Sequence, residues 1–304
     1  MVLPSHGRFE FSAIPTRPDY SWPNGKRLAM YVALNIETFG FGMELGTVLG
    51  NALPMPDHRN WSWREYGNRV GFWRMLDLFD ELKMPVAHLA NSYLYDTHPE
   101  IPQAIRGRRD EFVGHGRTNS ERPGGRPEEE ERALIIESTA AIARHEGQPP
   151  RGWMTPLMAE SKVSLDLLQE AGYRYVLDWP VDDQPIWMQT RSGRLLNVPY
   201  PTELNDYVVT CQLNQDPVQY TGAIFRQFEE LVEQSEKQPL VFSLALHTMI
   251  SGQPHRLRLL RDTLNRIFDH PRFDRVWLTL PGEIASFCEG LPVGTIPGDK
   301  NPKP

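Results

Sequence analysis

Two apolar stretches of the sequence run directly into side chains that can exchange a proton. YVALNI is followed at once by Glu37, and LVFSLAL is followed at once by His247. A carboxylate can take a proton from water and an imidazole can give one to a departing nitrogen, so the pair could add water to an acyl carbon and break a C–N bond. We therefore predict that Glu37 and His247 are the catalytic residues of a hydrolase.

Other apolar stretches also end on polar or aromatic side chains. His115 stands between Gly114 and Gly116, an arrangement that lets the backbone approach a ligand closely, although an ordinary turn would explain the glycines equally well. The remaining endings are His88 with Asn91, Trp153 and Asp178. We predict that all these side chains gather with Glu37 and His247 on one face of the protein.

The elements that must position these residues alternate between strands and helices. Apolar, β-branched runs predict strands over 28–36, 84–90, 111–115, 151–154, 174–178, 195–199, 240–246 and 275–280. Helical spacing and capping residues predict helices over 66–82, 127–146, 162–171, 217–236, 255–269 and 282–289. The first helix should bury one face, made of Val70, Trp73, Leu76, Phe79 and Leu82.

This alternation along 304 residues fits either a doubly wound parallel sheet or a closed βα barrel. In both architectures the ligand binds at the carboxyl ends of the strands, where the connecting loops meet. The polar residues that end the strands are therefore expected to line one pocket.

Composition and short motifs argue against several other functions. The formal net charge is −7 and the basic residues are scattered, which disfavours a nucleic acid as partner. The sequence has no Walker A loop, no GxGxxG after a strand and no GxSxG. It shows no export signal and no run near the roughly 18 apolar residues of a membrane span. We expect a cytoplasmic protein that acts on a small-molecule substrate, with neither membrane nor nucleic acid as its partner.

The segment 40–64 is longer than most connections, which predicts a lid over the site or a contact between copies of the chain. Trp61 and Trp63 would then line the pocket or the interface, with packing against the barrel as the alternative. We expect a homo-oligomer. Cys211 and Cys288 lie far apart without metal-type spacing, and we expect both to be free thiols.

Five motifs, taken in order, resemble one known family. They are LNxE at 34–37, EYGxRxGxWR at 65–74, HG at 115–116, GW at 152–153 and LxxH at 244–247. This order, over about residues 20–290, resembles the polysaccharide deacetylase (NodB homology) superfamily and, within it, the branch of bacterial allantoinases and related cyclic-amide hydrolases. The resemblance implies a distorted (β/α) barrel, usually of seven strands, that hydrolyses C–N bonds other than peptide bonds. We accordingly expect an N-terminal extension over 1–20, one barrel domain over 21–290 and a flexible tail over 291–304.

The sequence departs from the family pattern at the metal site. Sugar deacetylases carry TFDDG at the end of the first strand and a later HxxxH, which supply the base and the metal ligands. Here Glu37 stands in place of the base, Thr38 in place of the ligand acid, and Asn119 in place of the second histidine. Threonine and asparagine are poor zinc donors, so the resemblance favours the metal-independent reaction of the allantoinase branch. If one zinc or other divalent ion is bound, its expected ligands are Glu37, His115 and His247.

The resemblance also implies which residues bind the substrate. His115 and Asn119 would steady the oxyanion, and the segment RGWMTP together with the end of the next strand would supply Arg151, Trp153, Thr155 and Asp178. Trp153 could instead belong to the core. The expected substrate is a small cyclic amide, ureide or imide of the allantoin type. The alternatives are a metal-dependent N-deacetylase of an N-acetylated sugar and a catalytically silent barrel that binds a ligand.

Overall fold

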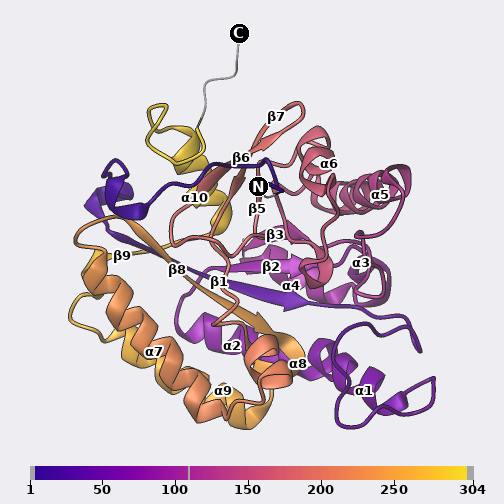
Figure 1. Ribbon diagram of the computed structural model, residues 1–304. Coiled ribbons are helices and arrows are strands. Elements are labelled where there is room, and N and C mark those ends of the chain that lie inside the picture. Colours follow the sequence, from indigo (N-terminus) through magenta and orange to yellow (C-terminus); the bar gives the residue numbers. More distant parts are fainter. Residues whose placement is uncertain (1–3, 109, 300–304) are drawn as a thin grey trace.

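The computed structural model describes residues 4–108 and 110–299, which are organised around one nine-stranded sheet (Figure 1). The strand order is β6-β7-β5-β4-β3-β2-β1-β8, and β9 pairs with the first residues of β1. Every pair is parallel except the hairpin of β6 and β7. The strands are β1 (Leu28–Ile36), β2 (Val86–Ala90), β3 (Glu111–Gly114), β4 (Gly152–Trp153), β5 (Tyr175–Val176), β6 (Ile186–Thr190), β7 (Gly193–Asn197), β8 (Leu240–His247) and β9 (Val276–Leu278).

The sheet curls, because side chains from strands far apart in its order share one interior cluster. Tyr31 of β1, Tyr175 of β5 and Val241 of β8 all belong to this cluster. The curled parallel sheet confirms the distorted (β/α) barrel, although the sheet has nine strands and not seven. The strand that sequence patterns missed is β6, whose residues IWMQT contain no run of β-branched residues and which lies at one end of the sheet.

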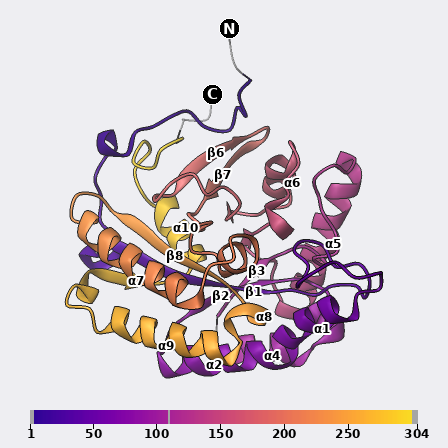
Figure 2. The ribbon, with the colours of Figure 1, turned by 60° about the horizontal axis from the view of Figure 1, so that its bottom comes forward.

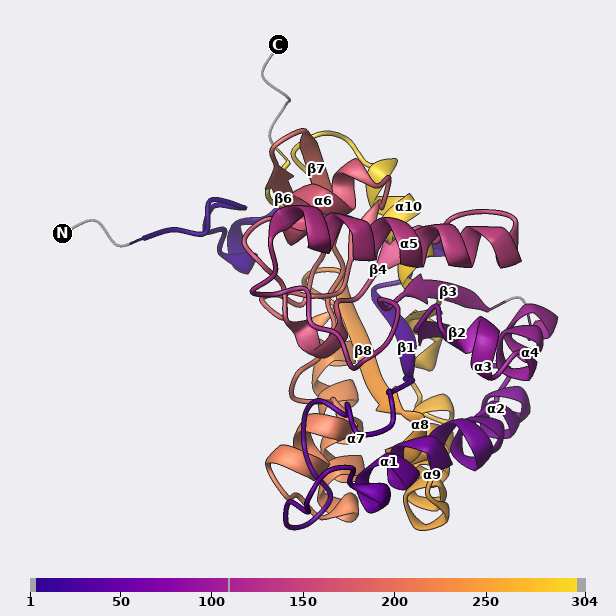
Figure 3. The ribbon, with the colours of Figure 1, turned by 90° about the vertical axis from the view of Figure 1, so that its right-hand side faces the viewer.

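Helices cover the outer face of the sheet. In Figure 3, α5 and α6 lie on the opposite side of the molecule from α1 and α9. The helices are α1 (His58–Tyr66), α2 (Phe72–Glu81), α3 (Leu94–Thr97), α4 (Glu100–Arg108), α5 (Glu128–Glu146), α6 (Ser164–Glu170), α7 (Pro217–Gln234), α8 (Thr248–Ser251), α9 (Pro254–Phe268) and α10 (Pro281–Glu289). As predicted, α5 carries glutamates in its first turn and ends at Gly147, which adopts a left-handed conformation with φ of 76°.

The helix predicted over 66–82 is interrupted by a π-helical turn at Gly67–Gly71. A π turn contains more residues than an α turn and therefore rotates the following helix about its axis. The buried face of α2 is accordingly formed by Phe72, Met75, Leu76, Leu78 and Phe79. Trp73, which was expected on this face, is 37% exposed, so that part of the prediction was wrong.

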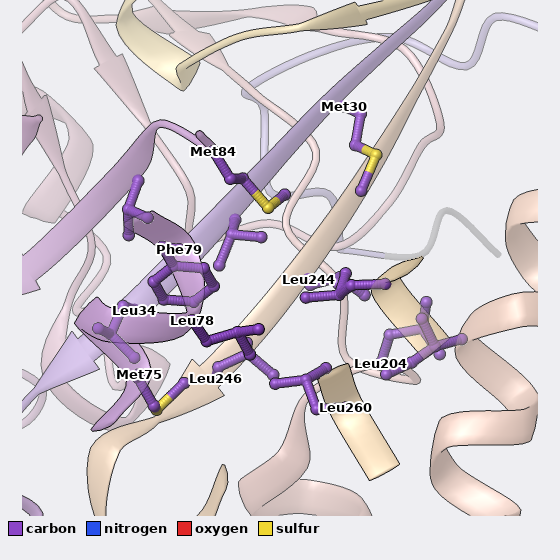
Figure 4. Close-up of a cluster of buried hydrophobic side chains, with 14 of the residues drawn as sticks. Met30, Leu34, Met75, Leu78, Phe79, Met84, Leu204, Leu244, Leu246 and Leu260 are labelled. Atoms are coloured by element: carbon purple, nitrogen blue, oxygen red, sulfur yellow. The ribbon is translucent and has the colours of Figure 1, made fainter. Parts of the chain in front are cut away.

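The two faces of β1 pack against different surroundings. Its even-numbered residues face the helices, where Met30 and Leu34 contact a cluster completed by α2, β8 and α9 (Figure 4). Its odd-numbered residues Ala29, Tyr31 and Ala33 face the interior of the barrel. Because side chains alternate along a strand, residues 35 and 37 are directed to the interior as well.

The two terminal segments pack along β6 (Figure 2). The N–H of Trp187 donates to the carbonyl of Pro297, and the N–H of Gln189 donates to the carbonyl of Arg8. These bonds cover an otherwise unpaired edge of the sheet. Of the predicted tail, Pro297 and Gly298 bond to β6, and residues 300–304 lie outside the described residues. Over residues 4–108 and 110–299, no helix has the length and apolar content needed to cross a membrane.

Candidate active site

Glu37 lies directly after β1 and reaches the interior of the barrel at the carboxyl ends of the strands. Its side chain borders a cavity of about 90 Å³ that is also lined by Arg64, His115 and His247. Its Oε1 atom lies 3.7 Å from Nε2 of His115 and 3.7 Å from Nε2 of His247. The structure therefore brings together the two predicted catalytic residues and one predicted substrate-binding residue.

A chain of amide groups fixes which atom of Asn119 faces Glu37. The backbone N–H of Thr38 donates to Oδ1 of Asn91 over 2.7 Å, so the Nδ2 group of Asn91 must point the other way, to Oδ1 of Asn119 at 2.9 Å. The Nδ2 group of Asn119 is thereby left to donate to Oε1 of Glu37 over 2.5 Å. Asn119 thus presents an N–H to the catalytic carboxylate and has no free lone pair on that side.

His247 is held by Asp206, a residue that the sequence patterns did not identify. The Nδ1 atom of His247 lies 2.7 Å from Oδ1 of Asp206, and the backbone N–H of His247 donates to Oδ2. Ser251 in α8 also donates to Oδ2, over 2.6 Å. The pair keeps Nδ1 protonated and directs Nε2 toward Glu37 and the cavity, as a general acid requires.

The surroundings shift the pKa values of both catalytic groups in useful directions. Burial alone would raise the pKa of Glu37, but the interactions with His115 and His247 outweigh it and lower the pKa below its ordinary value. Burial alone would lower the pKa of His247, but the carboxylates of Asp206 and Glu37 raise it above its ordinary value. Near neutral pH these shifts favour an ionised base and a protonated acid.

His115 is supported through the same ring nitrogen as His247, but by a backbone carbonyl and not by a carboxylate. Its Nδ1 atom lies 2.7 Å from the carbonyl oxygen of Met154, which can only accept a hydrogen bond, so Nδ1 carries a proton. Within the described residues its buried Nε2 atom has no hydrogen-bond partner. The protonated ring directs an Nε2–H toward Glu37, and this is the form that lowers the pKa of Glu37. In the neutral ring Nε2 is an acceptor, which suits a water molecule better than an oxyanion.

The glycines of the EYGxRxGxWR motif let the π turn pack against the end of β8. A Cβ atom on Gly67 would collide with Thr248, and one on Gly71 would collide with the carbonyl group of Thr248. Thr248 directly follows His247 and begins α8. Between the two glycines, Asn68 donates to the carbonyl of Glu37 over 2.9 Å. The motif therefore links the ends of the two strands that carry the catalytic residues.

The long segment before α1 is held against Arg64, which lines the cavity from α1. Arg64, which is 3% exposed, donates to the carbonyls of Leu45 and Thr47, and the N–H of Thr47 donates to the hydroxyl of Tyr207. Trp63 packs with Tyr207 near the site, whereas Trp61 donates to the carbonyl of Phe39. The observed loop is shorter than the predicted segment 40–64, because α1 begins at His58.

The opposite wall of the cavity is apolar and has an unusual backbone. Leu157 and Met158 line it, and both adopt positive φ angles, of 60° and 53°. Consecutive positive φ angles at residues other than glycine are strained, and strain of this kind concentrates at functional sites.

Of the six predicted substrate-binding residues only His115 lines this cavity, and Asn119 lies behind it in contact with Glu37. Thr155 donates through its N–H and its hydroxyl to Asp178, and the indole of Trp153 donates to Thr155. These three residues are buried and support the loop behind His115. Arg151 precedes β4 and donates to Gly282 and Ser286 of α10, at the amino end of the strand. The resemblance to the family placed Arg151 near the ligand, but in the structure it contacts α10 and does not line this cavity.

Comparisons with known proteins agree with this geometry. No model of a known protein family matches the chain. It is 28% identical over 297 residues to a Schizosaccharomyces pombe protein named "Putative polysaccharide deacetylase", which covers 87% of this chain and 91% of that protein. The solved structure of "Puue Allantoinase" is 26% identical with a TM-score of 0.78, covering 88% of this chain and 92% of that one.

Two further solved structures are similar. A "probable Polysaccharide deacetylase" of Pseudomonas aeruginosa PAO1 is 26% identical with a TM-score of 0.78, covering 88% of this chain and 93% of that one. One from Mycobacterium smegmatis, at 21% identity and a TM-score of 0.77, shares the fold, covering 94% of this chain and 97% of that one. In sequence and in fold the chain is therefore similar to proteins of the polysaccharide deacetylase superfamily. These relatives indicate a hydrolase of C–N bonds other than peptide bonds.

The residues of this chain do not fit the metal site of the sugar deacetylases in the superfamily. Over residues 4–108 and 110–299, no group of three or more His, Cys, Asp or Glu side chains is arranged to hold a metal ion. At the position of the second histidine, Asn119 directs an N–H toward Glu37, and Thr38 faces Asn91. An N–H cannot donate a lone pair to a cation. In the alternative ligand set of Glu37, His115 and His247, the Oε1 atom of Glu37 that lies near both histidines already accepts the N–H of Asn119.

The structure adds residues that the sequence did not single out. Asp206 lies in the irregular segment PTELND, where neither periodicity nor a motif marks it. Asn35 could have been found, because it belongs to LNxE and shares the interior face with Glu37. The remaining polar residues that line the cavity are Arg64, Tyr200, Asn205, Tyr207 and Gln212.

Proposed function

We propose that this protein hydrolyses a small cyclic amide, ureide or imide. The observation that carries the proposal is a cavity of about 90 Å³ in which Glu37, His115 and the Asp206-supported His247 converge. At about 30 Å³ for each water molecule in the liquid, this space corresponds to roughly three waters, which suits a compact small molecule. The likeness to an allantoinase structure supports the same class of substrate.

Glu37 and His115 hold the attacking water in this reaction. Water donates one hydrogen to Oε1 of Glu37 and the other to Nε2 of His115, which leaves an oxygen lone pair for the substrate carbonyl. Glu37 takes the proton as the C–O bond forms, and the π electrons of the carbonyl move to its oxygen. The N–H of Asn119 keeps the carboxylate in position for this transfer.

His247 completes the reaction by protonating the leaving nitrogen. As the tetrahedral intermediate collapses, the C–N bond breaks and its electron pair stays on nitrogen, which takes the proton from Nε2 of His247. The ring opens to a carboxylic acid at one end and an N–H group at the other, so that one water molecule has been added. Asp206 stabilises the protonated imidazole before this step.

A substrate panel tests the proposal directly. Purified protein is assayed with allantoin, hydantoin, succinimide and N-acetylglucosamine, each before and after dialysis against a chelator. We expect ring opening of at least one cyclic compound and the same rate after dialysis. Turnover of the N-acetyl sugar alone, lost on dialysis and restored by a divalent metal, would support a deacetylase and contradict the proposal.

Glu37→Gln tests the role of the base. Because Gln retains the size of the side chain and loses the base, we expect the fold to persist and kcat to fall by on the order of 10³-fold or more. Circular dichroism and thermal unfolding check the fold. Unchanged turnover in the folded variant would exclude Glu37 as the base.

A further inference from the structure

Tyr200 lines the same cavity from the segment that follows β7. Its side chain is 2% exposed, and it borders the space shared by Glu37 and His247. The mechanism above gives it no part. It nevertheless brings a hydroxyl group close to the reacting atoms, and the hydrogen bonds of that hydroxyl can be accounted for one by one.

Both acceptor positions of the Tyr200 hydroxyl are occupied. The Nδ2 group of Asn35 donates to the hydroxyl oxygen over 3.1 Å, and the Nδ2 group of Asn205 approaches the same oxygen at 3.5 Å. A tyrosine hydroxyl has two lone pairs and one hydrogen. Within the described residues no acceptor is found for this hydrogen, so it remains available to a molecule in the cavity.

The orientation of both amide groups is fixed by backbone partners. Asn35 also directs its Nδ2 group to the carbonyl of Leu246 at 3.1 Å, which only a donor can satisfy. Asn205 accepts through Oδ1 from the N–H groups of Tyr207 and Val208, so its Nδ2 group must face Tyr200. Neither amide can turn over and accept the hydrogen of Tyr200.

The hydroxyl is rigidly positioned and stays protonated. The carbonyl of Pro199 accepts from the hydroxyls of Tyr31 and Ser243, over 2.5 Å and 3.1 Å, which fixes the backbone next to Tyr200. Burial raises the pKa of Tyr200 well above its ordinary value, so it is a donor over the whole working range of pH. A donor held in place before the reaction is the arrangement that stabilises a developing oxyanion.

We propose that Tyr200 is a further catalytic residue, whose O–H donates to the substrate carbonyl oxygen as that oxygen becomes negatively charged. The proposal rests on the hydrolysis proposed above and gives that reaction its oxyanion donor. No proton is transferred: the hydrogen bond strengthens when water adds and weakens when the C–N bond breaks. The substrate class that fits is one whose scissile carbon carries an oxygen able to accept this bond.

Tyr200→Phe tests the proposal, with Tyr175→Phe as its matched control. Both residues are buried tyrosines of the barrel interior, but the hydroxyl of Tyr175 donates to Glu111 at the amino end of the strands. We expect Tyr200→Phe to lower kcat by on the order of 10²- to 10³-fold with little change in KM, the size of effect seen when one oxyanion donor is removed. Tyr175→Phe should keep kcat within a few-fold even where it lowers the melting temperature.

A substrate with sulfur in place of the carbonyl oxygens separates catalysis from support of the fold. Sulfur accepts hydrogen bonds weakly, so the rate ratio of oxygen to sulfur substrate should be smaller in Tyr200→Phe than in the wild type. If Tyr200→Phe does not fold, Asn205→Asp replaces it, because the new carboxylate keeps the two backbone bonds and draws the tyrosine hydrogen away from the cavity. It should lower kcat although the tyrosine remains.

The outcomes distinguish this proposal from the one on which it rests. If the wild type opens cyclic amides and Glu37→Gln is inactive, but Tyr200→Phe keeps its kcat or its oxygen-to-sulfur ratio, the role of Tyr200 alone is overturned. If the wild type opens none of the cyclic compounds, both proposals are overturned.

Discussion

Two buried His–Asp pairs lie on the same sheet, and they differ in the side of the sheet that they face. In one, Nδ1 of His247 lies 2.7 Å from Asp206; in the other, Nε2 of His88 lies 2.9 Å from Asp110. Both histidines are almost fully buried. The pair of His247 lines the cavity next to Glu37, whereas that of His88 does not.

The register of the strands explains the difference. His88 of β2 lies beside Leu34 of β1, whose side chain packs outward against the helices, and the ring of His88 lies 6.1 Å from that of Phe72 in α2. His247 of β8 lies beside Asn35, whose side chain faces the interior. A shift of one residue along either strand would exchange the two sides.

The comparison teaches that the chemistry of the pair does not decide its role. Asp110 also accepts from the side chain of Arg108 and the N–H of Val86, so it joins the beginnings of two strands. Asp206 accepts from the backbone of His247 and from Ser251, so it fixes one imidazole beside a cavity. We interpret the first pair as structural and the second as catalytic.

The largest difference in kcat is expected between two matched variants, in which the aspartate of one pair or of the other is replaced by asparagine. Asp206→Asn removes the charge that supports protonated His247 and disturbs its tautomer, so kcat should fall by on the order of 10²- to 10⁴-fold. Asp110→Asn makes the same change on the other side of the sheet and should keep kcat within a few-fold. Steady-state kinetics on the best cyclic substrate measure both.

Equal losses of kcat in the two folded variants would contradict the division into a catalytic and a structural pair. Thermal unfolding of both variants is the control, since it shows whether any loss of kcat follows from partial unfolding.

Gly71→Ala should produce the next largest effect, because it disrupts the contact between the π turn and Thr248, the residue after His247. The new methyl group would collide with the carbonyl of Thr248 and force α8 away from the π turn. We expect a loss of about 1–3 kcal/mol of stability and a lower kcat. In the control, Gly107→Ala in α4, the Cβ meets open space and should change stability by no more than about 1 kcal/mol. A Gly71→Ala variant as stable and active as wild type would show that this contact is not tight.

The sequence predicted much of this arrangement because its signals are local. Glu37 and His247 each stand at the end of a long apolar strand. Because side chains alternate along a strand, the pattern assigns both of them to the interior of the barrel. His88 was wrongly grouped with them, because it stands inside β2 and not at its end. The side of the sheet that His88 faces depends on the register between β2 and β1, and the sequence of one strand does not reveal that register.

What could not be predicted depends on contacts between distant segments. Tyr200 reaches the cavity, and Asp206 reaches His247, from an irregular segment whose path is set by bonds such as Tyr31 to Pro199. Arg151 was placed near the ligand by the family resemblance alone, and its contact with α10, far along the chain, could not be derived from the local sequence. The poor fit to the metal site of the sugar deacetylases depends on the orientation of the Asn119 amide, which is fixed by Asn91.

A smaller effect is expected in the pH dependence of stability around Asp110. Burial raises the pKa of Asp110, but His88 and Arg108 outweigh it and lower that pKa below the ordinary 3.8. A lowered pKa contributes stability that is present above about pH 4 and is lost as the pH falls through the folded-state pKa. Asp110→Asn should therefore be less stable than wild type by about 1–3 kcal/mol at pH 7. The difference should shrink toward pH 3 in urea unfolding, and a difference independent of pH would contradict this account.

The smallest expected effect is a shift in the pH profile of kcat/KM. This shift also distinguishes the two His–Asp pairs. Activity should fall in acid as Glu37 is protonated, below the ordinary glutamate pKa of 4.5, because its pKa is lowered. It should fall in alkali as His247 loses its proton, above the ordinary 6.5, because Asp206 raises the pKa of His247. Asp206→Asn removes that support, so the alkaline limb should move to lower pH, while Asp110→Asn leaves both limbs in place. An alkaline limb that moves with Asp110 and not with Asp206 would assign the titrating imidazole to His88 and reverse the roles of the two pairs.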